Sequence, residues 1–382
     1  MAIKNDEIRR TQQMIVGILS MQKVDNLGSL LQAYGLKKVL ESLGSETEFM
    51  DIKKIDEDYN LSKEHAQDFS GELEAKGLTG LYQKLNKYFA VRIRNKLLNI
   101  KQKRYFDEFR IKQLEIYRKN ETYDICVIGS DEVFNCLNAA QWGYTSQLFG
   151  NIPEAGKIIT YAASCGETRY QDLPYEIEKR IRNTFQNIDS FSVRDSNTYD
   201  FVSKLTDKTA KEHLDPALIY DFKDELRNTK IPVKMKRYCI IYSYRNRIHE
   251  KRDIENIKSF CRRHQLTPVA VGASQFWIHE FAVCPPFECL KLFQYAEFVI
   301  TDTFHGTIFS IQYADRFAVL IKESNQNKLM DLVGKIGLEQ HLINDMNELE
   351  KAYCAVKDKN RIDEKIKIER KKTKDYLREA LL

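Results

Sequence analysis

Short apolar runs alternate with longer amphipathic stretches along the first half of the chain. Residues 14–19 are apolar and rich in β-branched side chains, which is typical of a buried parallel strand. Apolar residues then recur at helical spacing from about Ser29, and Gly44 predicts the end of this helix. A second strand is predicted over residues 46–52. This order of strand, loop, helix and strand is typical of a doubly wound sheet.

The same order continues along the chain, and the polar residues 221–236 are the best linker between its two halves. We therefore expect an α/β protein with two Rossmann-like, doubly wound domains, over residues 1–222 and 223–345. The charged residues 346–382 are predicted to form helices that could cross back onto the first domain. The further predicted strands are 123–128, 157–163, 190–194, 238–242, 267–271, 298–301 and 317–321; the further helices are one of about 15 residues from Pro174, one from Ser196, and 253–264, 287–295 and 306–313.

Residues from about 60 to 120 interrupt this alternation and are predicted to form several helices. Between Lys84 and Lys119 there are twelve Lys or Arg and three Asp or Glu, interleaved with apolar residues. One interpretation is a set of helices that pack on the sheet and expose a solvated basic face. The other is a surface that meets anionic lipid headgroups or a lipid-diphosphate substrate.

Composition narrows the class of protein. The chain has 382 residues, 43% of them hydrophobic and 30% charged, which is typical of a globular protein. The net charge of +5 does not indicate a nucleic-acid partner for the chain as a whole. None of the eight cysteines forms a Cys-x-x-Cys pair or a cluster with metal-ligand spacing, so we expect no metal and buried free thiols in a reducing compartment. The charged N-terminus and the lack of a long apolar run predict a cytoplasmic protein.

Ligands of open α/β sheets bind beyond the carboxyl ends of the strands. That rule selects the loops that follow Leu19, Ile128, Ala163, Tyr242 and Ile300, because each carries polar residues or glycine directly after an apolar strand. The candidate site is therefore expected where these five loops converge.

The sharpest of these loops is Thr301-Asp-Thr-Phe-His-Gly-Thr307. His305 is predicted at a strand-to-helix turn, next to a helix N-terminus whose free N–H groups can hold an anion. A lone histidine is usually structural, but this setting favours a functional one. Asp302 could instead cap the helix. The candidate ligand contacts around His305 are Asp302, Thr303, Gly306 and Thr307.

The loop Gly129-Ser-Asp-Glu-Val-Phe-Asn135 holds the corresponding candidates in the first half. Asp131 follows a buried strand directly, which favours a carboxylate in the cleft that accepts a proton from a sugar hydroxyl. Ser130 beside it is a candidate substrate contact. The alternative is the start of a helix with a capping-box pattern.

Arg194 lies at another predicted strand end, where its planar fork would suit a carboxylate or phosphate. The alternative is an ion pair with Asp195 or another acid. Arg245 and Arg247, after the strand 238–242, have the same interpretation with less support. Asn26 and Gly28 could direct backbone N–H groups toward a ligand, although a complete Gly-x-Gly-x-x-Gly motif is absent.

Together these motifs resemble the polysaccharide pyruvyl transferase family, in an order and spacing that extend from about residue 15 to about residue 345. The resemblance implies a GT-B-like fold, in which two Rossmann-like domains face a cleft, here with the donor side expected in the second domain and the acceptor side in the first. It also implies transfer of pyruvate from phosphoenolpyruvate to a sugar, with no cofactor. The resembling stretches are residues 17–34, 123–135, 161–166, 192–195, 214–216 and 296–307.

The resemblance carries roles over to particular residues. His305 matches the family's catalytic His, and Arg194 matches its Arg in the Ser-Val-Arg pattern. Some members carry Arg two residues before the His, where this chain has Thr303, so another cation must face the donor phosphate. The candidates are Lys328, Arg245 and Arg247. Our hypothesis has His305 as general acid, Asp131 as base or hydroxyl-orienting group, and Arg194 on the donor's anionic groups.

The expected acceptor is a sugar of a bacterial surface polysaccharide or its precursor, either free or linked to undecaprenyl diphosphate. A peripheral contact with the inner face of the cell membrane would fit the second of these. Two other functions stay open: a nucleotide-sugar-dependent GT-B glycosyltransferase, and a carbohydrate-binding or assembly protein without catalysis. The three functions differ in donor and turnover, which a binding assay and a product assay separate.

Overall fold

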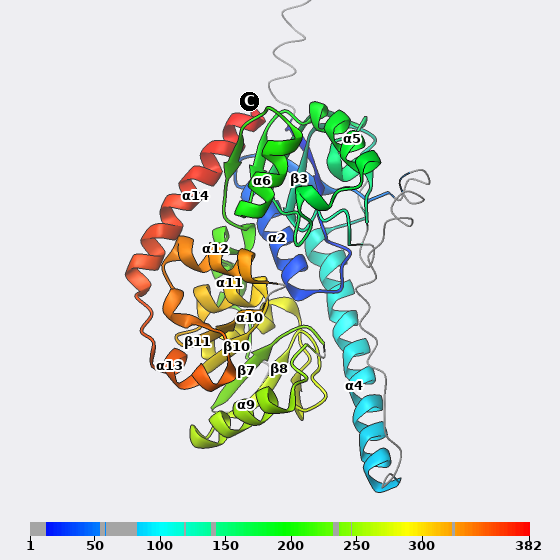
Figure 1. Cartoon of the computed structure of the whole chain (residues 1–382). Coiled ribbons are helices and arrows are strands. Elements are labelled where there is room, and N and C mark those ends of the chain that lie inside the picture. The colour runs from blue at the N-terminus through cyan, green and yellow to red at the C-terminus, as the bar shows by residue number, and fades with distance from the viewer. Residues whose placement is uncertain are drawn as a thin grey trace, which may run out of the picture.

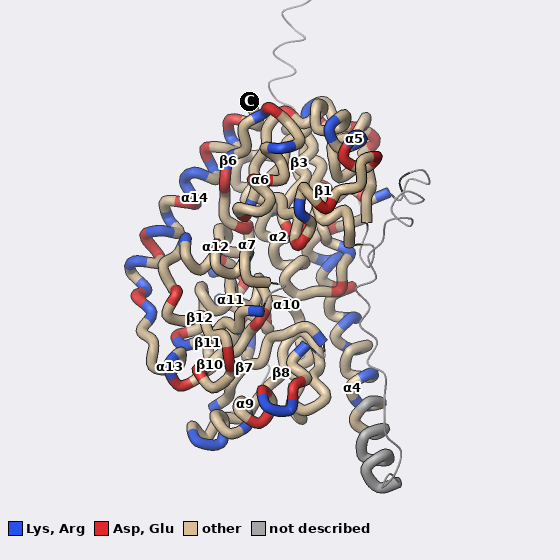
Figure 2. The backbone as a smooth tube through the Cα atoms, viewed as in Figure 1, with Lys and Arg blue, Asp and Glu red and all other residues tan. Residues whose placement is uncertain are grey.

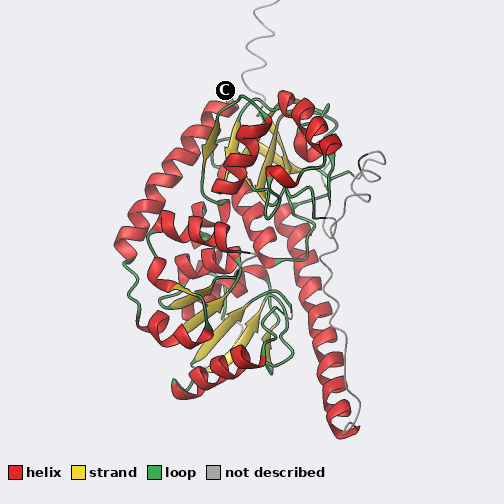
Figure 3. Cartoon of the chain, viewed as in Figure 1, coloured by secondary structure: helices red, strands yellow, loops and turns green. Residues whose placement is uncertain are grey.

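The computed structural model describes residues 13–53, 58, 82–117, 120–138, 143–231, 237–245, 247–322 and 325–382, with the backbone alone for residues 82–90 and 92. These residues form two stacked α/β domains (Figures 1 and 3). Each domain holds one six-stranded parallel sheet, so the predicted α/β class with two doubly wound domains is confirmed.

The first domain contains the sheet with the strand order β2-β1-β3-β4-β5-β6. Every pair of neighbouring strands in it is parallel. The order reverses between β1 and β3, so the crevice beyond the carboxyl ends of these two strands is the expected binding position. The strands are β1 (Ile15–Leu19), β2 (Glu46–Phe49), β3 (Tyr123–Asp131), β4 (Ala155–Ala163), β5 (Phe191–Val193) and β6 (Ala210–Glu212).

The second domain repeats this architecture with the strand order β12-β11-β10-β7-β8-β9, again all parallel. Its order reverses between β10 and β7, which places a second crevice at their carboxyl ends. The strands are β7 (Tyr238–Tyr242), β8 (Thr267–Val271), β9 (Glu280–Ala282), β10 (Phe298–Thr301), β11 (Phe317–Leu320) and β12 (Leu342–Ile343).

Helices cover the sheets and join the domains (Figure 1). Most predicted helices and strands correspond to observed ones with shifted ends: the helix after Pro174 has 10 residues followed by a 3-10 turn, α11 begins two residues earlier than predicted, and β3 extends three residues past Ile128. The helices are α2 (Leu27–Glu41), α4 (Tyr82–Phe109), α5 (Tyr175–Thr184), α6 (Ser196–Leu205), α7 (Pro216–Ile219), α8 (Lys223–Arg227), α9 (Lys251–Arg263), α10 (Pro286–Tyr295), α11 (Phe304–Tyr313), α12 (Gln326–Ile336), α13 (Leu349–Cys354) and α14 (Lys359–Leu381).

Helix α2 fixes the two domains against each other. It is buried on nearly all sides, because it lies between its own sheet and the second domain. The ring of Tyr34 packs against Phe287 of α10, with centroids 5.2 Å apart, and against Phe222, at 6.1 Å. One apolar cluster contains residues of both sheets and of α2, so the core continues from one domain into the other. The relative placement of the two crevices therefore depends on apolar packing.

Helix α4 differs from the prediction of several helices. Residues 82–109 form one continuous helix, extended by a π-helical turn over Arg110–Leu114. The residues expected to form the start of this region, from about 60 to 81, lie outside the described residues. On the inner side, Gln102 donates to the Cys284 carbonyl at 2.9 Å, and Asn99 donates to Ser274 Oγ at 2.8 Å. Helix α4 thus connects the second domain to the first.

The C-terminal helix α14 runs from the second domain back along the first (Figure 1). The Tyr376 hydroxyl donates to the Thr160 carbonyl of β4 at 2.8 Å, and Lys157 donates to the Ala380 carbonyl at 2.6 Å. Leu377 of this helix is fully buried. Because both contacts lie on β4, this last helix covers the sheet that carries the first crevice.

The short edge strands β6, β9 and β12 were not predicted. Each has three residues or fewer, and such pieces lack the length that makes a strand pattern recognisable. Seven of the eight cysteines are buried thiols, and Cys354 is exposed. Among the described residues, no helix is long and apolar enough to cross a bilayer.

Leu377→Ala should lower the free energy of unfolding by about 3 kcal/mol, because it leaves a cavity under α14. Urea unfolding measures this, with Lys374→Ala on the exposed side of the same helix as the control, for which we expect a change within about 0.5 kcal/mol. A loss below about 1 kcal/mol for Leu377→Ala would show that α14 does not dock as described.

Candidate active site

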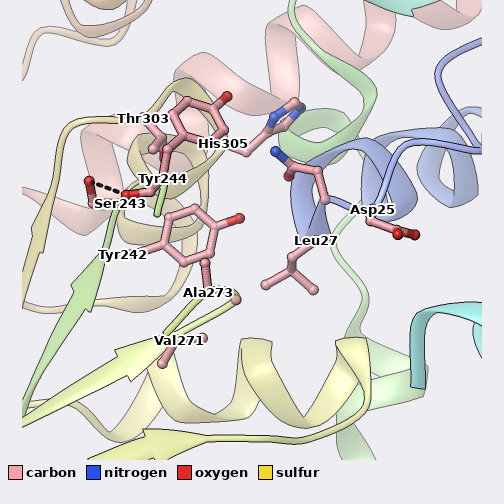
Figure 4. Close-up of a pocket in the computed structure, with 11 residues that line it drawn as sticks. Asp25, Leu27, Tyr242, Ser243, Tyr244, Val271, Ala273, Thr303 and His305 are labelled. Carbon is pink, nitrogen blue, oxygen red and sulfur yellow. Dashed lines mark hydrogen bonds between the residues drawn. The ribbon is translucent and has the colours of Figure 1, made fainter. Parts of the chain in front are cut away.

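The candidate site lies at the two crevices, one in each domain, where the strand order of the sheet reverses. The loops after β1 and β3 approach it from the first domain, and those after β7 and β10 approach it from the second. A pocket there is lined by Asp25, Asn26 and Leu27 of the first domain, and by residues of the second domain that include His305 (Figure 4). In the close-up, Tyr242, Tyr244 and His305 line one side of this pocket, and Asp25 and Leu27 line the other.

His305 is held in the first turn of α11. The Thr303 hydroxyl caps this helix by accepting from the Gly306 N–H at 3.0 Å, so Thr303 is the cap and the alternative that Asp302 caps it is wrong. Thr301 Oγ1 donates to the Tyr242 carbonyl at 2.7 Å and thereby ties β10 to β7 at the turn. His305 is 6% exposed and is one of the residues that line the pocket.

Gly28 makes the closest approach between the domains at this site. A Cβ built on Gly28 would overlap the His305 ring at Cγ and Nδ1. The Gly28 N–H donates to Asn26 Oδ1 at 2.7 Å, which caps α2. Asn26 therefore uses this N–H for the helix, and Gly28 serves the site by leaving room for the imidazole.

A buried carboxylate that the sequence analysis did not assign a role, Asp215, lies behind His305. Its Oδ2 is 3.7 Å from His305 Nε2, accepts from Arg194 Nη1 at 2.8 Å and accepts from Ser130 Oγ at 3.2 Å. Its Oδ1 caps α7 by accepting from the Ala217 N–H at 2.9 Å. Burial alone would raise the pKa of the Asp215 carboxyl, but His305 and Arg194 hold it well below its usual range.

Arg194 is turned toward this carboxylate. The residue is 4% exposed, and its guanidinium pairs with Asp215 and lies 4.0 Å from the centre of the Phe304 ring. Burial would lower the pKa of the guanidinium, but the charges of Asp215 and Asp131 raise it. Arg194 therefore forms the ion pair that the sequence analysis gave as the alternative to ligand binding, and its partner is Asp215.

Ser130 and Asp131 have backbone angles that are unusual for their residue types. Their φ values are 41° and 72°, in the left-handed region, although β3 continues through them and Asp131 pairs with Ala163 of β4. Such strain persists where surrounding contacts over-determine it, and it is common at functional sites. No helix starts here among the described residues, so the capping-box alternative is wrong.

The Asp131 carboxylate accepts from the Ser29 hydroxyl at 2.6 Å. Ser29 directly follows Gly28, whose Cα faces the His305 ring, so Asp131 and His305 both lie at the N-terminal end of α2. The two candidate acid–base groups, predicted from separate halves of the chain, are thus brought together.

Two ion pairs flank this centre. Lys328 pairs with Glu132 at 2.9 Å, and Arg247 lies 3.2 Å from Asp302. Burial would raise the pKa of the Glu132 carboxyl, but Lys328 lowers it to about 2. Burial raises the pKa of the Asp302 carboxyl despite the opposing charge of Arg247. Glu132 therefore holds Lys328, and Asp302 holds Arg247, beside the cleft.

Other predicted contacts lie outside the pocket. Arg245 is exposed on the loop after β7. Thr307 Oγ1 donates to the Thr303 carbonyl at 2.9 Å within its own helix, and Gly306 packs beside Thr301 and Tyr242. Within the described ranges, no three His, Cys, Asp or Glu side chains are placed to hold a metal ion.

The site can transfer protons between two positions. His305 offers a proton donor or acceptor in a pocket of low solvent exposure, and Asp131 offers a carboxylate near it. Sequence reasoning missed Asp215 as part of the site, although Asp directly before Pro216 is a recognisable helix start. Asp215 lies in the stretch 214–216 that resembles the family, but its contacts with residues 130, 194 and 305 are long-range, so no local pattern indicated its role.

Comparison with known sequences identifies one family. The sequence profile of the family described as polysaccharide pyruvyl transferase matches residues 26–320, which is most of the chain. No curated protein sequence matches the chain significantly.

Solved structures with similar folds are distant. A UDP-N-acetylglucosamine 2-epimerase from Rickettsia bellii is 9% identical, with a TM-score of 0.49 and 97% of each chain covered. A UDP-GlcNAc 2-epimerase from Methanocaldococcus jannaschii is 12% identical, with a TM-score of 0.46, and the match covers 95% of this chain and 99% of that one. Likenesses at this level carry no argument about the chemistry.

Gly28→Ala should impair the site through the His305 ring, since the added methyl group would overlap it. We expect catalytic turnover to fall by about 10²-fold, which is typical when a catalytic group is displaced by about 1 Å. We also expect the free energy of unfolding to fall by about 1–3 kcal/mol, because the site becomes overpacked. Gly334→Ala is the control, because a Cβ there meets no atom closer than 3.8 Å. Turnover of Gly28→Ala within twofold of the unaltered protein would refute the close approach.

Proposed function

Because the chain belongs to the polysaccharide pyruvyl transferase family, we propose that it transfers pyruvate from phosphoenolpyruvate to a sugar of a bacterial surface polysaccharide or its lipid-linked precursor. The product is a pyruvate ketal, and phosphate is released. The observation that carries the proposal is the position of His305, which matches the family's catalytic His and lies in the pocket between the two domains.

The chemistry needs one acid, one base and cations. His305 protonates the methylene carbon of phosphoenolpyruvate, which leaves an oxocarbenium-like centre at the neighbouring carbon. A sugar hydroxyl adds there and its proton passes to a base, for which we propose Asp131. Phosphate then leaves with the bond electrons, a second hydroxyl closes the ring, and its proton leaves with the phosphate. The proton on Asp131 then returns to His305, so that the two hydroxyl protons end up in the methyl group and the phosphate and both side chains regain their starting states.

Positive charge for the donor must come from residues other than Thr303. Arg194 already holds Asp215, so we assign it an indirect role. We propose that Arg247, whose side chain is 22% exposed, and Lys328 face the donor's phosphate and carboxylate. The charges of both act on Tyr244, which lines the pocket beside His305. Arg245 on the same loop is the further candidate.

The donor would then lie on the side of the second domain, and the acceptor would lie on the side of the first, where Asp131, Asn26 and Ser130 belong. A pocket open to both domains fits a reaction that joins two substrates. The activity itself would take place in the cytoplasm, at the inner face of the membrane if the acceptor is linked to undecaprenyl diphosphate.

Helix α4 supports such a membrane contact. Its outer face carries Ile93, Leu97 and Ile100, which are 59%, 61% and 44% exposed at helical spacing. Lys96 and Arg104 are exposed beside them, and basic residues recur along the described part of the helix (Figure 2). An apolar stripe with flanking basic residues is typical of helices that lie in an anionic lipid interface.

His305→Ala should reduce ketal formation by about 10²–10⁴-fold, because a general acid typically contributes that much. The assay incubates the protein with phosphoenolpyruvate and a panel of lipid-linked sugars, and scores the mass gain of one ketal. The control is His279→Ala, which removes an exposed histidine that does not line the pocket. If His305→Ala keeps more than half of the turnover, His305 is not the acid.

The donor separates this function from a nucleotide-sugar glycosyltransferase. Phosphoenolpyruvate should raise the thermal unfolding temperature, whereas UDP, GDP and their sugars should not, because a ligand stabilises only the state that binds it. Stabilisation by a nucleotide sugar alone would favour the glycosyltransferase, and phosphate release with any acceptor would exclude a protein without catalysis.

Liposomes that contain anionic lipid should bind the protein at low salt and release it at high salt. Leu97→Ser should weaken this binding, while Tyr175→Ser, which removes an even more exposed large side chain from α5, should not. If the protein does not sediment with such liposomes, the outer face of α4 is a solvated surface.

A further inference from the structure

Asp215 has contacts that its role as a helix cap does not explain. One oxygen caps α7, and that bond alone would satisfy the helix. The other oxygen, at 0% side-chain exposure, gathers Arg194, Ser130 and His305 from three different elements. A charged group so completely removed from water is costly unless its partners are fixed, so this convergence needs a reason.

We propose that Asp215 is a positioning residue that holds His305 in its charged, proton-donating form, and that Arg194 and Ser130 hold Asp215 in place. The inference rests on the proposed function of His305 as general acid. It assigns to this acid a buried carboxylate partner that belongs to the opposite domain.

The other charged or titratable groups near His305 are less well placed for this role. Asp131 at the end of β3 is bonded to Ser29 and is assigned to the acceptor hydroxyl. Asp25 lines the pocket but pairs with Lys103 and Arg110. The remaining titratable groups of the pocket are the hydroxyls of Tyr242, at the end of β7, and Tyr244, just after it, and the neighbouring residues of α11 are uncharged. Among the described residues, Asp215 is the acid whose ion pair reaches His305.

The support behind Asp215 is rigid. Ser130 donates to it from a backbone in the left-handed region, and the Ser130 carbonyl is itself held by the Ser20 hydroxyl at 3.3 Å. Arg194 is clamped between Asp215 and the ring of Phe304, the residue that precedes His305. Strain and close packing of this kind fix the carboxylate before any substrate arrives.

The distance to His305 matters for the mechanism. At 3.7 Å the pair is longer than a hydrogen bond, and His305 Nε2 has no hydrogen-bond partner among the described residues. Catalytic hydrogen bonds are often loose without substrate and tighten when it binds. We expect the pair of His305 and Asp215 to shorten in the same way when the donor binds.

Asp215→Asn keeps the shape and the cap but removes the charge. We expect kcat to fall at least tenfold, KM for phosphoenolpyruvate to change less than threefold, and the alkaline limit of activity to move to lower pH by about one unit. The sign follows because a negative neighbour favours the imidazolium, so the histidine loses its proton at lower pH without it. Asp195→Asn is the control, since Asp195 is also buried and its charge acts on Arg194, but it forms no ion pair with His305.

A titration that does not depend on turnover separates this inference from the proposed function. Histidine-labelled protein is followed by NMR from pH 5 to 9, with the His305 signal assigned by its loss in His305→Gln. The His305 titration should move to lower pH by about one unit in Asp215→Asn and stay in place in Asp195→Asn. Ser130→Ala should give a smaller shift in the same direction, which also tests the inference if Asp215→Asn unfolds. An unchanged His305 titration in the folded variants overturns the inference, whether or not pyruvyl transfer is found.

Discussion

The structure of the site depends on the close packing of helix α2 against the second domain. At Gly28 the backbone of the first domain comes so near to the His305 ring that no side chain fits between them. The aromatic contacts of Tyr34 further along α2 keep the helix in this position. Because the two domains share one apolar core, a group of one domain can face a group of the other at a fixed distance.

This packing brings charges together that the chain keeps far apart. Asp131 and Asp215 come from the first domain and His305 from the second, and they meet where the strand order of both sheets reverses. Low exposure strengthens each electrostatic contact there. It also requires that each charge be matched, which explains the pairs of Asp215 with Arg194 and of Glu132 with Lys328.

Periodicity and strand-end rules predicted the doubly wound sheets and most of their long elements, because each buried parallel strand is a continuous apolar run. The same rules could not show that β3 continues past Ile128, since Ser130 and Asp131 remain in the strand only through pairing with β4 and a strained backbone. They placed His305 beside the start of a helix, but they put that start two residues too late and offered Asp302 rather than Thr303 as the cap, because helix starts are uncertain by one or two residues. The role of Asp215 was missed because Arg194, Ser130 and His305, which it contacts at the site, are 21 or more residues away along the chain.

The central claim is that phosphoenolpyruvate binds between the domains with its methylene carbon at His305. A crystal structure of the protein with this donor and no acceptor tests the claim most directly. We expect the methylene carbon within about 3.5 Å of a ring nitrogen of His305 and the phosphate next to Arg247 or Lys328. Donor bound elsewhere, or bound here with the methylene carbon turned away from the imidazole, would contradict it.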